Sequence, residues 1–268
     1  GRKMAGYFPE ITSYKTDDLV MRVRNLTYLH VLNGVDLDVY RGEVLGIGGL
    51  AGQGQAELLQ ALYGVLKTKG EVRLKGKSIR LHSVKSAIRN GIALIPEERA
   101  IQGLILRDSI RYNISLPILN KISNPMWVSQ KKEYAVVDKY MKELQIKADS
   151  REMAAINLSG GNQQKVVMAK ILAMEPEVFL MHDITRGVDI GTKKEMFHMV
   201  REFAKEGHPV IFFSTDVEEL VNVCDRVAVM YDGKIQADLQ DQALTRENII
   251  KAAIGNSVDD ETAVKEGA

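Results

Sequence analysis

A glycine-rich stretch of the chain has the residue types and spacing of a phosphate-binding loop. Gly49, Gly52 and Gly54 lie between a strand-like and a helix-like segment, where glycines let backbone N–H groups close around an anion. The spacing fits G-x-x-x-x-G-K-[ST], but Gln55 replaces the lysine and Ala56 replaces the metal-binding hydroxyl. A neutral amide can donate a hydrogen bond without adding charge, whereas alanine cannot bind a metal. Taken alone, this stretch fits an ordinary strand-to-helix turn equally well.

A second candidate site is the start of a later helix, in the run LSGGNQQ. Ser159 is suited to cap the helix, and Gly160 and Gly161 allow close backbone approach. Asn162 and Gln163 follow in the first turn. Free N–H groups and the positive end of the helix dipole at such a position favour an anion. An ordinary capped helix start explains the residues about as well.

The strands and helices that must hold these loops are predicted to form an α/β fold. Short apolar strands alternate with helical stretches after residue 160, which indicates a parallel sheet. Strand-like segments at 19–25, 35–40 and 71–83 indicate an antiparallel β patch, and residues 104–160 a helical insertion. We expect a linker over residues 1–17, one domain over 18–255, and a disordered tail over 256–268.

Composition and charge narrow the class of protein. The chain has 268 residues, 45% hydrophobic and 26% charged, as in a globular protein. Its net charge of +1 gives no basic field for nucleic acid. The one cysteine, Cys224, lies in an apolar run and is expected to be buried. We find no apolar run long enough to span a membrane. The start at Gly1 instead of Met suggests a fragment.

Several local motifs together resemble the ABC-transporter ATPase family. The run LSGGNQQ is similar to its signature loop, IPEERAIQGLIL to its Q-loop, TRGVDIGTKKEMF to its D-loop region, and DRVAVMYDGKI to its closing strands. More narrowly, the chain resembles the C-terminal ATPase domain of tandem subunits that import ribose, galactose or xylose. The opening GRKMAGYFPE is similar to the linker between their two halves. The resemblance covers about residues 1–255 and implies a P-loop NTPase fold with a RecA-like core, and ATP with Mg²⁺ as cofactors.

Measured against that family, the chain's own catalytic positions are altered. Glu97 stands at the Q-loop glutamine position, and His182 replaces the aspartate that helps to hold Mg²⁺. Asp183 replaces the glutamate that polarises water, and Thr215 replaces the switch histidine. We expect His182 to be a hydrogen-bonded histidine and not a metal ligand. Tyr28 is either an adenine-stacking residue or a tyrosine of the sheet surface.

The resemblance also implies how the chain works with partners. Cassettes of this family pair head to tail, so Ser159, Gly160 and Gly161 would act on ATP held by the N-terminal cassette of the same subunit. Mg²⁺ is expected at that partner's site and weakly or not at all at this one, and the isolated domain is expected to be weak or inactive. Other expected partners are a membrane permease and, indirectly, a solute-binding protein, on the cytoplasmic face of the membrane.

Three alternatives remain open. The chain could be a regulatory module that binds nucleotide without hydrolysis, or its transporter could import nucleosides. A soluble ABC ATPase of translation or DNA maintenance is a further alternative, although such proteins carry long coiled-coil insertions or basic arms.

Overall fold

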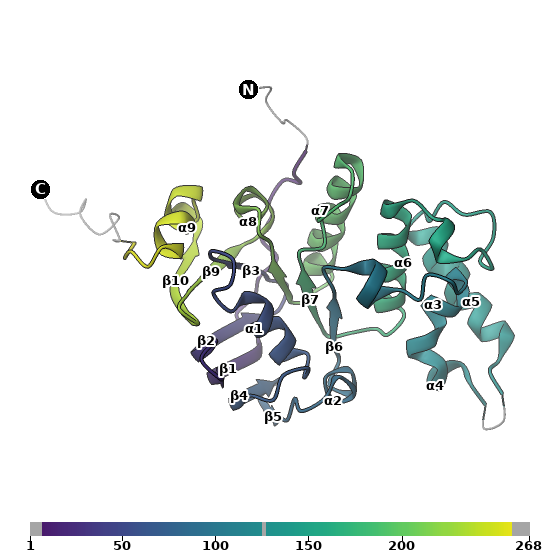
Figure 1. Ribbon diagram of the computed structural model, residues 1–268, viewed down its shortest axis with the longest axis horizontal. Helices are drawn as coiled ribbons and strands as arrows, with labels where there is room; N and C mark the ends of the chain where they lie inside the picture. The colour runs from purple at the N-terminus through teal and green to yellow at the C-terminus, as the bar shows by residue number, and fades with distance from the viewer. Residues whose placement is uncertain (1–6, 125–126, 259–268) are drawn as a thin grey trace, which may run out of the picture.

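The computed structural model describes residues 7–124 and 127–258, which form two sheets and the helices around them (Figure 1). The larger sheet has six strands in the order β10-β9-β3-β8-β7-β6. Only β10 runs antiparallel to its neighbour. The strands of this sheet are β3 (Val44–Gly48), β6 (Ile92–Ile95), β7 (Val178–His182), β8 (Val210–Phe213), β9 (Arg226–Tyr231) and β10 (Lys234–Gln240).

The smaller sheet is antiparallel and has four strands in the order β2-β1-β4-β5. Its strands alternate buried and exposed residues because one face is packed against the rest of the molecule. Helix α1 lies close to both sheets (Figure 1). The strands are β1 (Leu19–Tyr28), β2 (Leu32–Tyr40), β4 (Lys69–Leu74) and β5 (Lys77–Ile79).

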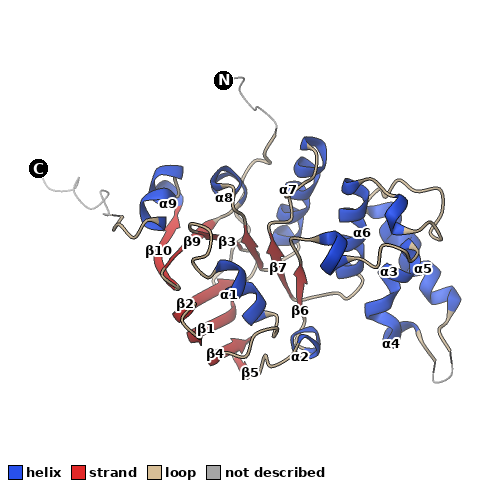
Figure 2. Ribbon diagram, in the orientation of Figure 1, coloured by secondary structure: helices blue, strands red, loops and turns tan. Residues whose placement is uncertain are grey.

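The helices flank the larger sheet, and one group of them forms the right-hand part of the molecule (Figure 2). That group contains α3, α4, α5 and the signature helix α6. None of the helices in the described ranges is long and apolar enough to cross a bilayer. The helices are α1 (Gln55–Leu62), α2 (Val84–Arg89), α3 (Ile110–Ser115), α4 (Leu119–Ile122), α5 (Gln130–Glu143), α6 (Gly160–Leu172), α7 (Ile190–Lys205), α8 (Val217–Val223) and α9 (Arg246–Ala253), with a π-helical turn at Arg99–Gly103 and 3₁₀ turns at Leu116–Ile118, Ala155–Asn157 and Asp241–Ala243.

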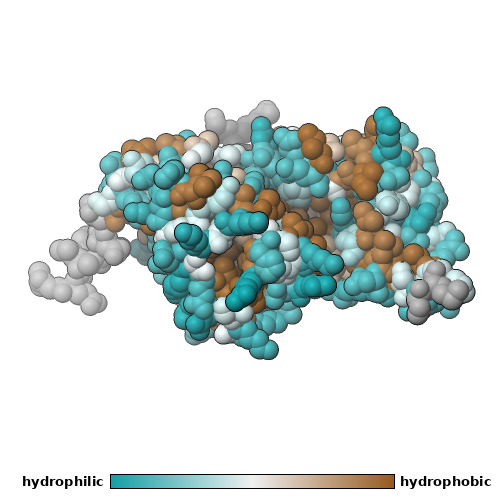
Figure 3. Space-filling view, turned by 60° about the horizontal axis from the view of Figure 1, so that its bottom comes forward, coloured by the Kyte–Doolittle hydropathy of each residue, from teal (hydrophilic) through white to brown (hydrophobic). Residues whose placement is uncertain are grey.

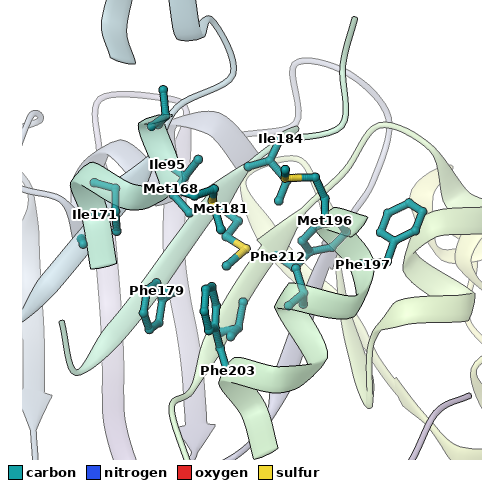
Figure 4. Close-up of a cluster of buried hydrophobic side chains, with 14 of the residues drawn as sticks. Ile95, Met168, Ile171, Phe179, Met181, Ile184, Met196, Phe197, Phe203 and Phe212 are labelled. Carbon is teal, nitrogen blue, oxygen red and sulfur yellow. The ribbon is translucent and has the colours of Figure 1, made fainter. Parts of the chain in front are cut away.

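The core consists of two apolar clusters on either side of the larger sheet. One packs alternate residues of β7 against α6 and α7, and Phe179 stacks on Phe203 with ring centroids 4.5 Å apart (Figure 4). The other fills the space between the two sheets and α1. Cys224 is buried in the first cluster, as expected. Because both faces of β3, β7 and β8 are covered, β3 and β8 are apolar throughout and β7 is apolar up to its last residue, His182.

The sequence prediction of an α/β fold with a parallel core and an antiparallel β patch is confirmed. Helices α3, α4 and α5 lie inside the predicted helical insertion at 104–160. The predicted domain limits themselves stay predictions. Residues 7–17 contain neither helix nor strand, and Tyr7 and Phe8 pack against Phe197 of α7. Residues 1–6 of the predicted linker and 259–268 of the predicted tail lie outside the described residues.

Two elements were not predicted from the sequence. Helix α2 is capped by Ser83, whose hydroxyl accepts a hydrogen bond from the Ser86 N–H at 3.2 Å. This helix has only six residues, too few for a repeating apolar pattern to reveal it in the sequence. The π-helical turn that begins at Arg99 lies within the Q-loop, where the sequence predicts no helix.

Candidate functional site

The glycine-rich loop joins β3 to α1 and has a backbone that only glycine adopts easily. Gly49, Gly52 and Gly54 have φ angles of 134°, 83° and 103°. At Gly49 a side chain would also have no room, because a Cβ there would lie 2.4 Å from Nε2 of Gln55 and 2.6 Å from the carbonyl oxygen of Met230. The loop therefore has the backbone of a phosphate-binding loop, and the Gln55 amide packs inside it.

Gln55 is bonded to the loop itself. Its side chain is buried, and Nε2 donates a 2.9 Å hydrogen bond to the carbonyl of Leu50. Gln53 lies two residues before Gln55, and its side-chain oxygen accepts a 2.6 Å hydrogen bond from the backbone N–H of Asp232. Ala56 is half-buried and has no side-chain oxygen for a metal. The polar side chains of the loop thus bond to this chain's own backbone.

Asp183 and Thr215, which follow neighbouring parallel strands, bond to each other at the ends of β7 and β8. The hydroxyl of Thr215 donates to Asp183 at 2.9 Å, and its backbone N–H donates to the other carboxylate oxygen at 3.4 Å. Asp183 is buried and has a left-handed backbone with φ 47°. Both carboxylate oxygens therefore face Thr215.

His182 is half-buried beside Asp183 and stacks near Phe213, with ring centroids 5.1 Å apart. Burial lowers the pKa of His182 below its ordinary value, and the carboxylates of Asp183 and Glu57 oppose this shift. This shift favours the neutral form of the imidazole. Its Nε2 lies 3.5 Å from a carboxylate oxygen of Glu97.

Glu97, at the Q-loop position, forms an ion pair with Arg186 in the loop that follows β7. Arg99, two residues further on, donates two long hydrogen bonds of 3.4 Å to the carbonyls of Arg186 and Gly187. The Q-loop and the loop after β7 are thus joined by both arginines. Neither arginine was singled out from the sequence, because an isolated arginine in a loop carries no spacing signal.

The signature helix α6 begins as the sequence predicts. Ser159 caps it, and its hydroxyl accepts bonds from the backbone N–H and the side-chain amide of Asn162, at 3.4 and 3.0 Å. Gln163 donates to the carbonyl of Ala155 at 3.1 Å. Ser159 itself is exposed, and Gly161 lies against Thr192 of α7, whose Oγ1 would be 2.4 Å from an added Cβ.

Within the described part of the chain, no hydrogen bond or ion pair joins residues 49–56 to residues 159–163. The two candidate anion sites therefore share no polar contact. Tyr28 is half-buried at the end of β1 and packs against the cluster between the sheets, which fits a sheet-surface tyrosine.

The residues at the position of a magnesium site do not suit that ion. Mg²⁺ prefers oxygen ligands in an octahedral arrangement. Ala56 offers no oxygen, His182 offers nitrogen, and the oxygens of Asp183 accept hydrogen bonds from Thr215. No group of three or more His, Cys, Asp or Glu in the described ranges could hold a metal.

A groove of about 590 Å³ opens beside this site, between α1, α2 and the helices of the right-hand part. Figure 3 shows apolar side chains gathered among polar ones on this side of the molecule, where the surface is hollowed. Lys170 lies in the groove and donates a 3.0 Å bond to the carbonyl of Gly103, and burial lowers its pKa. The groove is lined by Gln60, Tyr63, Val65, Ile88, Leu94, Pro96, Gln102, Gly103, Leu116, Pro117, Val167, Lys170, Ile171, Met174 and His182.

The sequence model of the family described as "ABC transporter" matches residues 32–186. This match extends from β2 through both candidate anion sites to the loop after β7. The chain belongs to the ABC transporter family.

This ABC cassette is similar to curated proteins named for ribose import. It is 42% identical over 258 residues to "Ribose import ATP-binding protein RbsA 1" of Rhizobium johnstonii, covering 95% of this chain and 50% of the relative. It is 40% identical over 256 residues to "Ribose import ATP-binding protein RbsA" of Halalkalibacterium halodurans, covering 95% and 51%. The chain therefore spans about half the length of the curated relatives it matches.

Solved structures confirm the fold of the ABC cassette. The ADP conformation of MJ1267, an ATP-binding cassette of an ABC transporter, superposes with a TM-score of 0.74 at 22% identity, covering 89% of this chain and 99% of that one. The cbiO1 protein of Clostridium perfringens, part of the ABC transporter complex cbiONQ, gives a TM-score of 0.70 at 25% identity, covering 89% and 93%.

Proposed function

We propose that the chain is an ATP-binding cassette of an importer for ribose-type sugars, located on the cytoplasmic face of the membrane. The names of the relatives, which describe ribose import and ATP binding, support this proposal. Its partners would be a membrane permease and, indirectly, a solute-binding protein. The permease and the solute-binding protein would select the solute.

We propose further that the cassette's two anion sites differ in role. In the signature loop Ser159 is exposed and Gly160 and Gly161 are partly exposed, whereas the Gln55 amide at the glycine-rich loop is buried and bonded to Leu50. This bond is the observation that carries the proposal. The signature loop would act in trans on ATP held by the N-terminal cassette of the same subunit, and the chain's own site would be degenerate.

The surroundings of Asp183 support weak or absent hydrolysis at the chain's own site. The carboxylate of Asp183, at the position of the residue that would polarise water, is buried, and each of its oxygens accepts a hydrogen bond from Thr215, which leaves fewer lone pairs for a water. The lysine that stabilises phosphate charge is also replaced by neutral Gln55. The isolated chain would then hydrolyse ATP at the background rate. Phosphate release that Asp183→Ala abolishes would contradict this.

The groove beside α2 is the surface that we assign to the permease. It is largely apolar, borders the Q-loop residues 96–103 and includes His182 at the end of β7. A permease segment lying there would contact both the Q-loop and the end of β7 beside the nucleotide site. Movements of the permease would then be coupled to changes at that site.

The decisive experiment compares Gly160→Asp and Gln55→Ala in the complete subunit with its permease. Gly160→Asp places a carboxylate where the partner's phosphate would lie, while an acidic residue in the first turn suits the helix itself. We expect it to abolish transport and ATP hydrolysis, and Gln55→Ala to change both by less than about threefold, since a neutral group contributes little to phosphate binding. Equal effects of the two substitutions would contradict the division of roles.

The regulatory alternative predicts a different result. A cassette that only senses nucleotide would leave the ATPase rate of the N-terminal cassette unchanged when it is added or removed. Measuring that rate with and without this chain separates the two functions.

A further inference from the structure

Arg99 lies against the start of the signature helix. A Cβ added to Gly160 would be only 2.7 Å from Nη2 of Arg99. The same guanidinium reaches the carbonyls of Arg186 and Gly187 in the loop after β7. It therefore sits between the loop after β7 and the signature loop, which faces the partner cassette under the proposed function.

The charge of Arg99 is poorly matched by its surroundings. It forms no ion pair with any residue that the structure describes, and Glu97, two residues earlier in the Q-loop, is paired with Arg186 instead. Its two carbonyl bonds are 3.4 Å long, beyond the usual range for N–H···O bonds. Its Nε is buried and has no partner. A guanidinium has five N–H donors, so most of its bonding capacity is unused.

The signature helix adds to this positive potential. Helix α6 has 13 residues, and its first N–H groups and dipole end are positive. The planar fork of arginine matches phosphate oxygens, and charge-assisted bonds are roughly twice as strong as neutral ones. An unpaired guanidinium beside such a helix start favours a polyanion over a single carboxylate or a neutral ligand.

We propose that Arg99 is a further phosphate-binding residue of the composite ATP site. It would bond the terminal phosphate of the ATP that the partner cassette presents to Ser159 and Gly160, and would stabilise the charge that develops there during hydrolysis. This inference rests on the proposed function of the signature loop. It adds a cation to a loop that otherwise offers only N–H groups and a hydroxyl.

The test measures kcat and KM for MgATP in the complete subunit with its permease. Arg99→Met should lower kcat/KM about a hundredfold, the scale seen when one donor to developing charge is removed. Arg99→Lys, which retains the charge, should recover about tenfold of that loss. Arg73→Met is the matched control: Arg73 pairs with Glu71 on the antiparallel sheet and should leave kcat/KM unchanged. The melting temperature of the isolated chain should be the same for Arg99→Met and the wild type.

Two results would overturn the inference while leaving the proposed function intact. One is wild-type kcat/KM in Arg99→Met when Gly160→Asp is inactive. The other is an equal loss in Arg99→Met and Arg99→Lys accompanied by a lower melting temperature, which would show that Arg99 only braces the loop after β7. Full activity of Gly160→Asp would instead contradict the proposed function. The inference about Arg99 would then fail as well, because it rests on that function.

Discussion

At the scale of single residues, polar side chains at the candidate nucleotide site form hydrogen bonds with other residues of this chain. Gln55 bonds to Leu50 and Asp183 bonds to Thr215, each within a buried setting. Satisfied buried polar groups stabilise a structure, whereas unsatisfied ones cost about 1–3 kcal/mol each. The side chains of Gln55 and Asp183 are therefore well bonded locally, which supports the proposal that this site is degenerate.

Restoring the family's residues should restore nucleotide binding. We expect the variant Gln55→Lys, Ala56→Thr, His182→Asp, Asp183→Glu to bind MgATP at least about tenfold more tightly than the wild type, because one bond to a charged group contributes about 1.5–3 kcal/mol. Titration of the isolated chain with a fluorescent ATP analogue, with and without EDTA, measures this. Gln55→Lys alone is a simpler variant with a smaller expected gain, and Gln55→Met is its uncharged control. Tight MgATP binding by the wild type would contradict the interpretation.

The sequence located these residues but not their partners. The spacing of the glycines predicted Gln55 and Ala56 as altered positions, and the resemblance to the ABC family predicted Asp183 and Thr215. That Thr215 bonds Asp183 depends on the neighbouring positions of β7 and β8 in the sheet. Arg99 was missed for a similar reason, because its environment is created by the start of α6 and the loop after β7, which are both distant in the sequence.

At the scale of elements, one buried arginine holds three segments together. Arg201 of α7 pairs with Asp225 before β9 and also donates to the carbonyls of Val223 and Thr12. Asp225 in turn accepts a 2.8 Å bond from the N–H of Val44 at the start of β3. This network joins the N-terminal segment, α7 and the central strand.

Removing this arginine should destabilise the fold severely. Arg201→Met leaves the buried carboxylate of Asp225 without its partner, a change that typically costs about 3–5 kcal/mol. Urea unfolding followed by circular dichroism measures the loss. Lys205→Met is the control on the same helix, since its exposed pair with Glu202 is expected to contribute about 0–1 kcal/mol. Similar free energies of unfolding for both variants would show that the network is unimportant.

The strands and helices that could be predicted from the sequence are those with a clear apolar pattern. Strands β3 and β8 are continuous apolar runs, β7 is one up to His182, and α7 has a clear apolar stripe, so these elements could be predicted from the sequence. Helix α2 buries only Ala87 and was missed. The order of strands in the larger sheet could not be predicted from the residues, because it depends on pairing between segments far apart in the chain.

At the scale of the whole molecule, only part of helix α2 lines the groove. Ile88 lines the groove, whereas Val84 on the same helix does not, although each is 37% exposed. If the permease occupies the groove, only the first position is in the interface.

A charge at each position should therefore have a different effect. We expect Ile88→Glu to weaken co-purification with the permease by at least about tenfold, because burying an unpaired carboxylate in an apolar contact is costly. Val84→Glu should leave it unchanged. Quantifying permease in pull-downs of the tagged subunit checks this, with far-ultraviolet circular dichroism confirming that both variants fold. Equal retention of the permease by the two variants would exclude the groove as its binding surface.

The position of Cys224 gives the protein a built-in reporter. Its thiol is 1% exposed and packs against the central strand, where a Cβ on Gly46 would lie 2.9 Å from Sγ. Burial also raises the pKa of this thiol well above its ordinary value, so the reactive thiolate is scarce. Alkylating reagents therefore reach the chain's one sulfhydryl only when the sheet opens. The rate at which Cys224 is labelled therefore measures how often the native structure opens locally, and no probe has to be introduced.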